Sequence, residues 1–151
     1  MELGIALALF GAVIAGGLAG AGSAVALGMA GQAAAAVVAE DPKKFGQTLV
    51  LQAVGTTNGI YGFVIAVLIL GQAFNVTDWQ TGLQVLASGI PIGLVGYIAA
   101  VAQGKTLVTG LMLIGKRSGE LVKAIIYAAM VETFAVLALL TSFLMFNNIQ
   151  F

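Results

Sequence analysis

Four long apolar stretches, separated by only three short polar breaks, restrict this chain more than any other feature of its sequence. They run from about Gly4 to Val38, Thr48 to Phe74, Leu83 to Ile114 and Leu121 to Phe146. A helix needs about 20 mostly apolar residues to cross a bilayer. The first and third stretches exceed that length, so we expect them to tilt or to project into water. The pattern predicts an all-α membrane protein with four transmembrane helices.

The composition excludes most soluble classes. Charged residues make up 8% of the 151 residues, against roughly a quarter in a soluble protein. The chain has no Cys, no His and no net charge, which argues against disulfides, thiol chemistry, the usual transition-metal ligands and nucleic-acid binding. The N-terminus, Met1-Glu2-Leu3, lacks the positive region of a signal peptide, so we expect the first stretch to be a retained helix.

The basic residues indicate an orientation in the cell membrane. All six lie in or near the first and third breaks: Lys43, Lys44, Lys105, Lys116, Arg117 and Lys123. Cytoplasmic loops of membrane proteins carry an excess of Lys and Arg. The loops near 40–46 and 115–121 are therefore predicted to be cytoplasmic, with both termini on the opposite side.

The chain repeats itself at a constant interval. Residues 17–28 align with residues 93–104, and seven of the twelve pairs are identical. The same alignment, continued without a gap, superimposes the two basic loops and places Thr56 at the position of Glu132. We therefore expect two tandem duplicated hairpins, 1–76 and 77–151, that form a single domain and cross the membrane in the same orientation.

Small residues recur every fourth position on the first and third stretches: Gly16, Gly20, Ala24 and Gly28 on one, and Gly96, Ala100 and Gly104 on the other. This spacing puts them on one helix face, where backbones can approach closely. The face is suited to packing within one four-helix bundle or against copies of the same helix around a ring. So many small residues favour the ring, with the bulkier second and fourth helices facing lipid.

Glu132 lies near the centre of the fourth stretch. An ionised carboxylate at that depth is costly unless it is paired, and such residues usually mark an ion path. Residues equidistant from the turn of a hairpin lie at the same depth. This arithmetic places Gln103 level with Glu132, and Thr57 and Asn58 at a similar distance beyond the first turn.

Two kinds of ion, a proton and a metal cation, fit such a layer of polar groups. A proton needs only the carboxylate and dry surroundings, whereas a bare metal cation needs about six oxygen ligands. Glu132, Gln103, Thr57, Asn58 and a carbonyl freed near Val54 provide such a set. One carboxylate balances one positive charge, which favours sodium over calcium.

At these residues the chain resembles a known family. The most specific segments are Phe45-Gly46-Gln47, Tyr61-Gly62-Phe63-Val64-Ile65-Ala66, Ala102-Gln103-Gly104-Lys105 and Ala128-Ala129-Met130-Val131-Glu132-Thr133. With them the chain closely resembles, over its whole length, the duplicated proteolipid (the K or c subunit) of bacterial V-type ATPases. The sodium-translocating members are the most similar.

The resemblance implies a ring of identical subunits that turns in the lipid, driven by ATP hydrolysis in a separate soluble sector. The subunit itself is then non-catalytic. Its implied partners are a stator membrane subunit that supplies an Arg, and central-stalk subunits seated on the cytoplasmic loops.

The resemblance also implies roles for individual residues. Glu132 is then the ion-binding carboxylate, Gln103 and Thr57 are ligands, Val54 offers its backbone carbonyl, and Tyr61 hydrogen-bonds and locks Glu132. The chain departs from the sodium-binding pattern at two positions. Asn58 stands where those members carry Gln, and Gly55 replaces the Pro of their Leu-Pro-Gly-Thr stretch.

Three alternatives to a sodium-carrying ring remain. The same ring can carry protons, the chain can be a self-contained channel or transporter, or it can be a purely structural membrane oligomer. A channel needs several ionisable groups along one pathway, whereas this chain places one, at one level.

Overall fold

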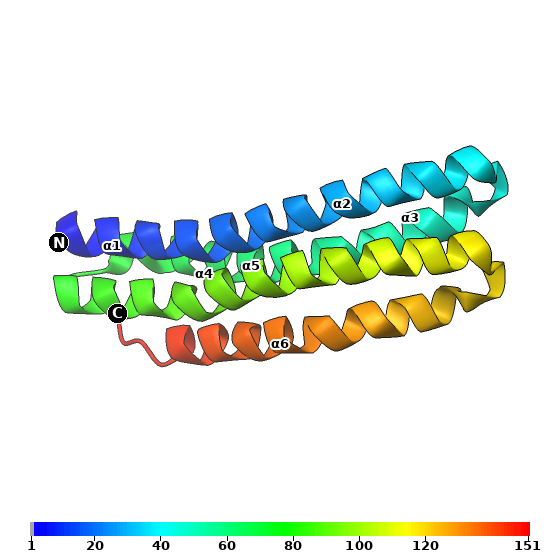
Figure 1. Cartoon of the computed structure of the whole chain (residues 1–151). Coiled ribbons are helices and arrows are strands. Elements are labelled where there is room, and N and C mark those ends of the chain that lie inside the picture. Colours follow the sequence, from blue (N-terminus) through cyan, green and yellow to red (C-terminus); the bar gives the residue numbers. More distant parts are fainter. Residues whose placement is uncertain (1) are drawn as a thin grey trace.

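A computed structural model describes residues 2–151, which form four long helical segments (Figure 1). The segments are Glu2–Glu40, Pro42–Asn75, Trp79–Lys116 and Ser118–Asn147, and each is long and apolar enough to cross a membrane. The four predicted transmembrane helices are confirmed. At about 1.5 Å per residue, the first and third segments are nearly twice as long as a bilayer core of about 30 Å is thick.

Short turns of other helix types interrupt the α-helices. In chain order the elements are α1 (Glu2–Ala12), a π-helical turn (Val13–Leu18), α2 (Ala19–Glu40), a 3-10 turn (Pro42–Lys44), α3 (Phe45–Ala53), a 3-10 turn (Val54–Thr56), α4 (Thr57–Gln72), a 3-10 turn (Ala73–Asn75), α5 (Trp79–Lys116), a 3-10 turn (Ser118–Glu120) and α6 (Leu121–Asn147).

The four segments run alternately up and down as one bundle (Figure 1). The first and third connections lie at one end, and both ends of the chain lie near the second connection at the other. α5 packs along the first segment and along α6, while α6 contacts only α5 and the second segment to any extent. α6 is therefore the most weakly covered of the four spans, and it carries Glu132.

The duplicated hairpin is visible in the element boundaries. α2 ends at Glu40 and α5 at Lys116, while α3 begins at Phe45 and α6 at Leu121. Asp41 and Arg117, which join these helices, have nearly the same backbone angles, φ −142° and ψ 97° against φ −141° and ψ 96°. The members of each pair are separated by the same interval as residues 17 and 93 of the repeat, which confirms the predicted duplication.

Two aspartates start helical segments at the connections. The Asp41 carboxylate accepts a hydrogen bond from the Lys43 amide at 3.1 Å, ahead of Pro42 at the first helical position. Asp78 caps α5 by accepting a 2.7 Å bond from the Thr81 amide. This amide and its neighbours hold the pKa of Asp78 below its usual range.

Pro91 lies inside α5, where it removes one amide donor and displaces the preceding carbonyl. The amide of the next residue, Ile92, finds a partner on another helix, because it donates to the buried Ser142 hydroxyl of α6 at 3.1 Å. Ser142 therefore binds the backbone directly after the proline, where the ladder of helical hydrogen bonds is disturbed.

Small residues bring the first segment and α5 into backbone contact. A Cβ atom added at Gly89 lies 2.3 Å from the Gly11 carbonyl oxygen, and one added at Gly104 lies 2.6 Å from the Ala26 Cα. Part of the small-residue face thus packs within the bundle. Gly20 and Gly28 do not take part, since a Cβ atom at either meets nothing within 4 Å.

Candidate ion-binding site

Glu132 sits midway along α6 and is half-buried between three helices. Its two carboxylate oxygens have different partners. Oε1 accepts a 2.5 Å hydrogen bond from the Tyr61 hydroxyl of α4, and Oε2 accepts a longer 3.4 Å bond from the Gln103 amide of α5. The structure therefore brings two of the predicted site residues, Tyr61 and Gln103, into hydrogen-bond contact with Glu132.

Gln103 links Glu132 to the second segment. Its side chain is fully buried, and its Nε2 donates to the Ala128 carbonyl at 3.2 Å as well as to Glu132. Its Oε1 accepts a 2.8 Å hydrogen bond from Asn58 Nδ2. Since a carbonyl and a carboxylate only accept, they fix which end of the Gln103 amide faces α6.

The orientation of Gln103 determines that of Asn58 in turn. The Gln103 oxygen requires a donor, so Asn58 presents its NH2 group and turns its own oxygen away. Asn58 is fully buried, and its Oδ1 has no hydrogen-bond partner among residues 2–151. A buried, unsatisfied amide oxygen is costly in a native protein and calls for an explanation. A cation is the type of ligand that such an oxygen accepts.

Thr57 and Val54 pair with each other beside this cluster. The Thr57 hydroxyl donates to the Val54 carbonyl at 3.0 Å, and the Thr57 amide donates to the same carbonyl. None of the hydrogen bonds within residues 2–151 joins either residue to Glu132. The structure therefore brings together Tyr61, Glu132, Gln103 and Asn58, with Val54 and Thr57 adjacent to Asn58 in the chain.

A 3-10 turn places these groups. Val54–Thr56 interrupts the second segment immediately before Thr57 and Asn58. Gly55 permits close packing there, because a Cβ atom at that position lies 3.1 Å from Leu107 of α5.

Two groups at the site were missed at the sequence level. The Ala128 carbonyl lies one helical turn before Glu132, and its contact with Gln103 follows from that i−4 position. The Ser23 hydroxyl of α2 accepts a 2.8 Å bond from the Gly59 amide. The sequence signal for Ser23 was that its hydroxyl stands alone in a stretch rich in Gly and Ala.

The charge at the site comes from Glu132. The ion pairs formed by residues 2–151 are Asp41 with Lys44 and Glu120 with Lys123, both at the connections. Residues 2–151 contain no group of three His, Cys, Asp or Glu side chains that could hold a metal. Any metal cation here must be bound by one carboxylate together with neutral oxygens.

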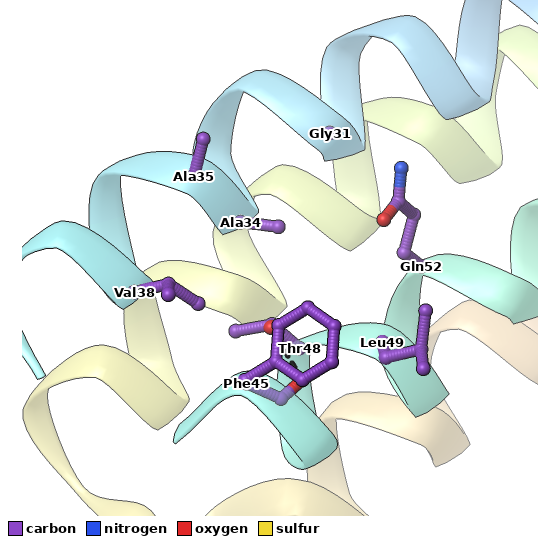
Figure 2. A pocket seen from close by; sticks show the side chains of 8 residues that line it. All are labelled: Gly31, Ala34, Ala35, Val38, Phe45, Thr48, Leu49 and Gln52. Carbon is purple, nitrogen blue, oxygen red and sulfur yellow. Dashed lines mark hydrogen bonds between the residues drawn. The ribbon is translucent and has the colours of Figure 1, made fainter. Parts of the chain in front are cut away.

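The hollow between α2 and α3 has a different chemistry (Figure 2). It has a volume of about 260 Å³ and lies near the first connection. It is lined by Gly31, Ala34, Ala35, Val38, Phe45, Thr48, Leu49 and Gln52. The donors of its two polar side chains are already used, since the Thr48 hydroxyl donates to the Phe45 carbonyl and the Gln52 amide to the Leu27 carbonyl. Because its lining contains no charged residue, this hollow is a poorer candidate ion site than the Glu132 cluster.

Comparison with known proteins gives the family. The family model that describes the C subunit of ATP synthase matches the chain twice, over residues 10–69 and residues 86–145. The chain belongs to this family. The internal repeat relates the two matches, because residue 10 corresponds to residue 86 and residue 69 to residue 145.

Two relatives cover most of the chain. The V-type sodium ATPase subunit K of Enterococcus hirae is 45% identical over 132 residues, which cover 85% of this chain and 83% of the relative. The A-type ATP synthase subunit K of Methanocaldococcus jannaschii is 38% identical over 139 residues, which cover 92% of this chain and 61% of the relative. The resemblance to the V-type proteolipid is confirmed. The chain is a multi-pass membrane protein and a non-catalytic, ion-translocating subunit of an ATPase.

Proposed function

We propose that the chain carries one sodium ion per subunit at the Glu132 cluster and translocates it as a ring of identical subunits turns in the membrane. The observation that carries this proposal is the unsatisfied Asn58 oxygen, buried next to Gln103. A proton on Glu132 leaves that oxygen without a partner, whereas a sodium ion provides one. The name of the E. hirae relative, a sodium ATPase subunit, agrees with this choice.

The proposed ligands come from three segments. They are one oxygen of Glu132, the side-chain oxygens of Gln103, Asn58 and Thr57, and the Val54 carbonyl. Gln103 Oε1 accepts one hydrogen bond and keeps a second lone pair for the ion. The Val54 carbonyl accepts two, from the Thr57 amide and hydroxyl, so the Thr57 hydroxyl must turn from this carbonyl towards the ion when sodium binds. Tyr61 stays outside this set and holds the carboxylate by its other oxygen.

Charge balance explains how rotation couples to transport. With a monovalent cation bound, Glu132 has no net local charge and can pass through lipid at low cost. An empty, ionised Glu132 must face water or a cation instead. We propose that a stator membrane subunit supplies this cation as an Arg side chain.

The basic loops complete the proposed assembly. We place the loops near 40–46 and 115–121 in the cytoplasm, in contact with central-stalk subunits, and both termini on the opposite side. The hairpins 1–76 and 77–151 then cross the membrane in the same orientation. Attaching a membrane-impermeant label to single cysteines introduced at Lys43 and at the C-terminus tests this sidedness.

The experiment that separates sodium from protons is carbodiimide labelling of the purified protein, with the label located by mass spectrometry on the segment that contains Glu132. We expect millimolar sodium to slow labelling of Glu132 at constant pH, with potassium as the control. Protection that depends on pH and not on sodium contradicts the sodium site and supports the proton-carrying ring.

A further inference from the structure

The buried hydroxyl of Ser23 makes a contact that the proposed ligand set does not use. Ser23 lies on α2, is 5% exposed, and accepts a 2.8 Å hydrogen bond from the Gly59 amide of α4. The contact joins the first segment to the second at the level of the ion site, because Gly59 directly follows Asn58. Because the partner of the Ser23 hydroxyl is a backbone amide, this hydrogen bond influences the backbone path of the second segment.

The Gly59 amide needs an outside partner because of where it lies in the helix. In a regular α-helix the amide of Asn58 binds the Val54 carbonyl and the amide of Gly59 binds the Gly55 carbonyl. Here the Val54 carbonyl instead receives the Thr57 amide, in the i−3 pattern of the 3-10 turn. Ser23 offers the Gly59 amide a bond at the point where i−3 pairing gives way to i−4 pairing.

The close approach of α2 and α4 depends on the absence of a side chain at Gly59. A Cβ atom added there lies 3.1 Å from both the Cβ and the Oγ atoms of Ser23. The lone buried hydroxyl of this stretch and the glycine opposite it therefore form one matched contact. The 3-10 turn that it stabilises begins at Val54 and directly precedes Thr57 and Asn58.

We propose that Ser23 is a positioning residue for sodium, and this inference rests on the sodium site proposed above. By holding the Gly59 amide, Ser23 maintains the 3-10 turn that presents the Val54 carbonyl, the Thr57 hydroxyl and the Asn58 amide. Without the hydroxyl, the Gly59 amide returns to the Gly55 carbonyl and the segment relaxes towards a regular α-helix. The Val54 carbonyl then binds the Asn58 amide in place of the Thr57 amide, so its direction changes, and Asn58 turns relative to Gln103.

This role predicts a selective defect. Gln103 and Glu132 lie on α5 and α6, and Ser23 has no recorded hydrogen bond to either. Tyr61 lies on α4, in the regular helix that follows the 3-10 turn. A change at Ser23 therefore removes sodium ligands while leaving the Glu132 carboxylate and its Tyr61 bond in place. Sodium affinity falls, and the reaction of Glu132 in the absence of sodium does not change.

The test compares Ser23→Ala with Ser142→Ala in the intact protein. Ser142 is the matched control, because it is also a buried serine whose hydroxyl accepts a bond from a backbone amide of another helix. The readouts are the sodium concentration that half-protects Glu132 from a carbodiimide at fixed pH, and the pH profile of labelling without sodium. We expect Ser23→Ala to raise the half-protecting concentration about tenfold and leave the pH profile unchanged. We expect Ser142→Ala to change neither readout.

Ser23→Cys provides a second variant if loss of the hydroxyl prevents assembly. It keeps a side chain of similar shape but replaces a good acceptor with a weak one, so we expect a smaller shift in the same direction. Unchanged sodium protection in Ser23→Ala or Ser23→Cys, with a normally protected wild type, overturns the role of Ser23 alone. An equal shift in Ser142→Ala also overturns it, because the effect is then general loosening. A wild type that sodium does not protect contradicts the proposed sodium site itself.

Discussion

Tyr61 and Gln103 divide the two oxygens of Glu132 between them, and the two bonds differ greatly in length. The Tyr61 hydroxyl lies 2.5 Å from Oε1, whereas Gln103 Nε2 lies 3.4 Å from Oε2. A short bond from a hydroxyl to a carboxylate is the stronger type. Tyr61 therefore fixes the rotamer of Glu132, and the looser Gln103 side can open to admit an ion.

We expect Tyr61→Phe to release Glu132. A hydrogen bond to a charged group contributes about 1.5–3 kcal/mol, so sodium affinity should fall at least about tenfold. Glu132 should also react faster with a carbodiimide when sodium is absent. Tyr127→Phe is the control, because Tyr127 lies on the same helix as Glu132 but is 62% exposed. Equal labelling rates in both variants contradict the locking role of Tyr61.

The residues of the site were only partly predictable from the sequence. Equal depth in a hairpin put Gln103 level with Glu132, because helix rise per residue is constant. It could not determine the direction of each side chain. Thr57 lies at the expected depth, yet its hydroxyl binds the Val54 carbonyl, a local bond that threonine in helices commonly makes. The unsatisfied oxygen of Asn58 is a property of the whole network and has no sequence signal.

At the scale of elements, Lys44 joins the two hairpins at their basic end. Its side chain is 13% exposed, and its ammonium group donates to the Gly115 carbonyl in the last turn of α5. A cation at this position also interacts favourably with the negative end of the helix dipole. The 4.0 Å separation from Asp41 makes that ion pair the lesser contact.

We expect Lys44→Met to lower the free energy of unfolding by about 1.5–3 kcal/mol, the range for a hydrogen bond with a charged partner. Methionine keeps most of the apolar stem and removes the donor. The midpoint of thermal unfolding in detergent measures the change. Lys43→Met is the matched control, since Lys43 is exposed and its side chain has no recorded bond. A similar decrease in the unfolding midpoint in both variants contradicts this role of Lys44, because the effect is then one of net charge alone.

The elements themselves were predicted more completely than their irregularities. The four spans and their connections follow from apolar length and from the basic breaks, and the internal repeat fixes the first and third connections together. The π-helical turn at Val13–Leu18 and the 3-10 turn at Val54–Thr56 were not predicted as such. Both lie in stretches whose residues are compatible with a regular helix, and interhelical packing decides their geometry.

At the scale of the whole molecule, the repeat makes one face of the bundle incomplete. Gly93, Gly96 and Gly104 of α5 pack tightly against the first hairpin, with added Cβ atoms 2.6–3.1 Å from its atoms. Their counterparts in the first copy of the repeat are Gly17, Gly20 and Gly28. A Cβ atom at Gly20 or Gly28 meets nothing within 4 Å, and one at Gly17 meets only its own helix. A groove of about 440 Å³, lined in part by Gly20 and Thr56, runs beside them.

The internal contact provides a template for the contact between neighbouring copies of the chain. Gly104 packs on Ala26 within the chain, and the repeat then pairs Gly28 with Ala102 of a neighbouring copy. Gly93 packs on Ile14, and the corresponding pair is Gly17 with Ile90 of the neighbour. Ile90 and Ala102 are exposed in the single chain, as this arrangement requires. A contact repeated in this way is head-to-tail, the type of interface that builds a ring when the rotation between copies closes.

We therefore expect Gly20→Leu combined with Gly28→Leu to abolish the ring while leaving each copy folded. The added side chains meet open space within one copy. Between copies, the Gly96 and Gly104 contacts place them against Val95 and the backbone of Ala102 of the neighbour. Native mass spectrometry in detergent measures the assembly, and circular dichroism measures the helix content. Gly71→Leu is the control, because Gly71 also has nothing within 4 Å, and its counterpart Asn147 is exposed and so lies outside the internal contact. A ring that survives the double substitution rules out this face as the contact, since a leucine cannot fit where the Gly104 template brings an added Cβ atom to 2.6 Å from backbone.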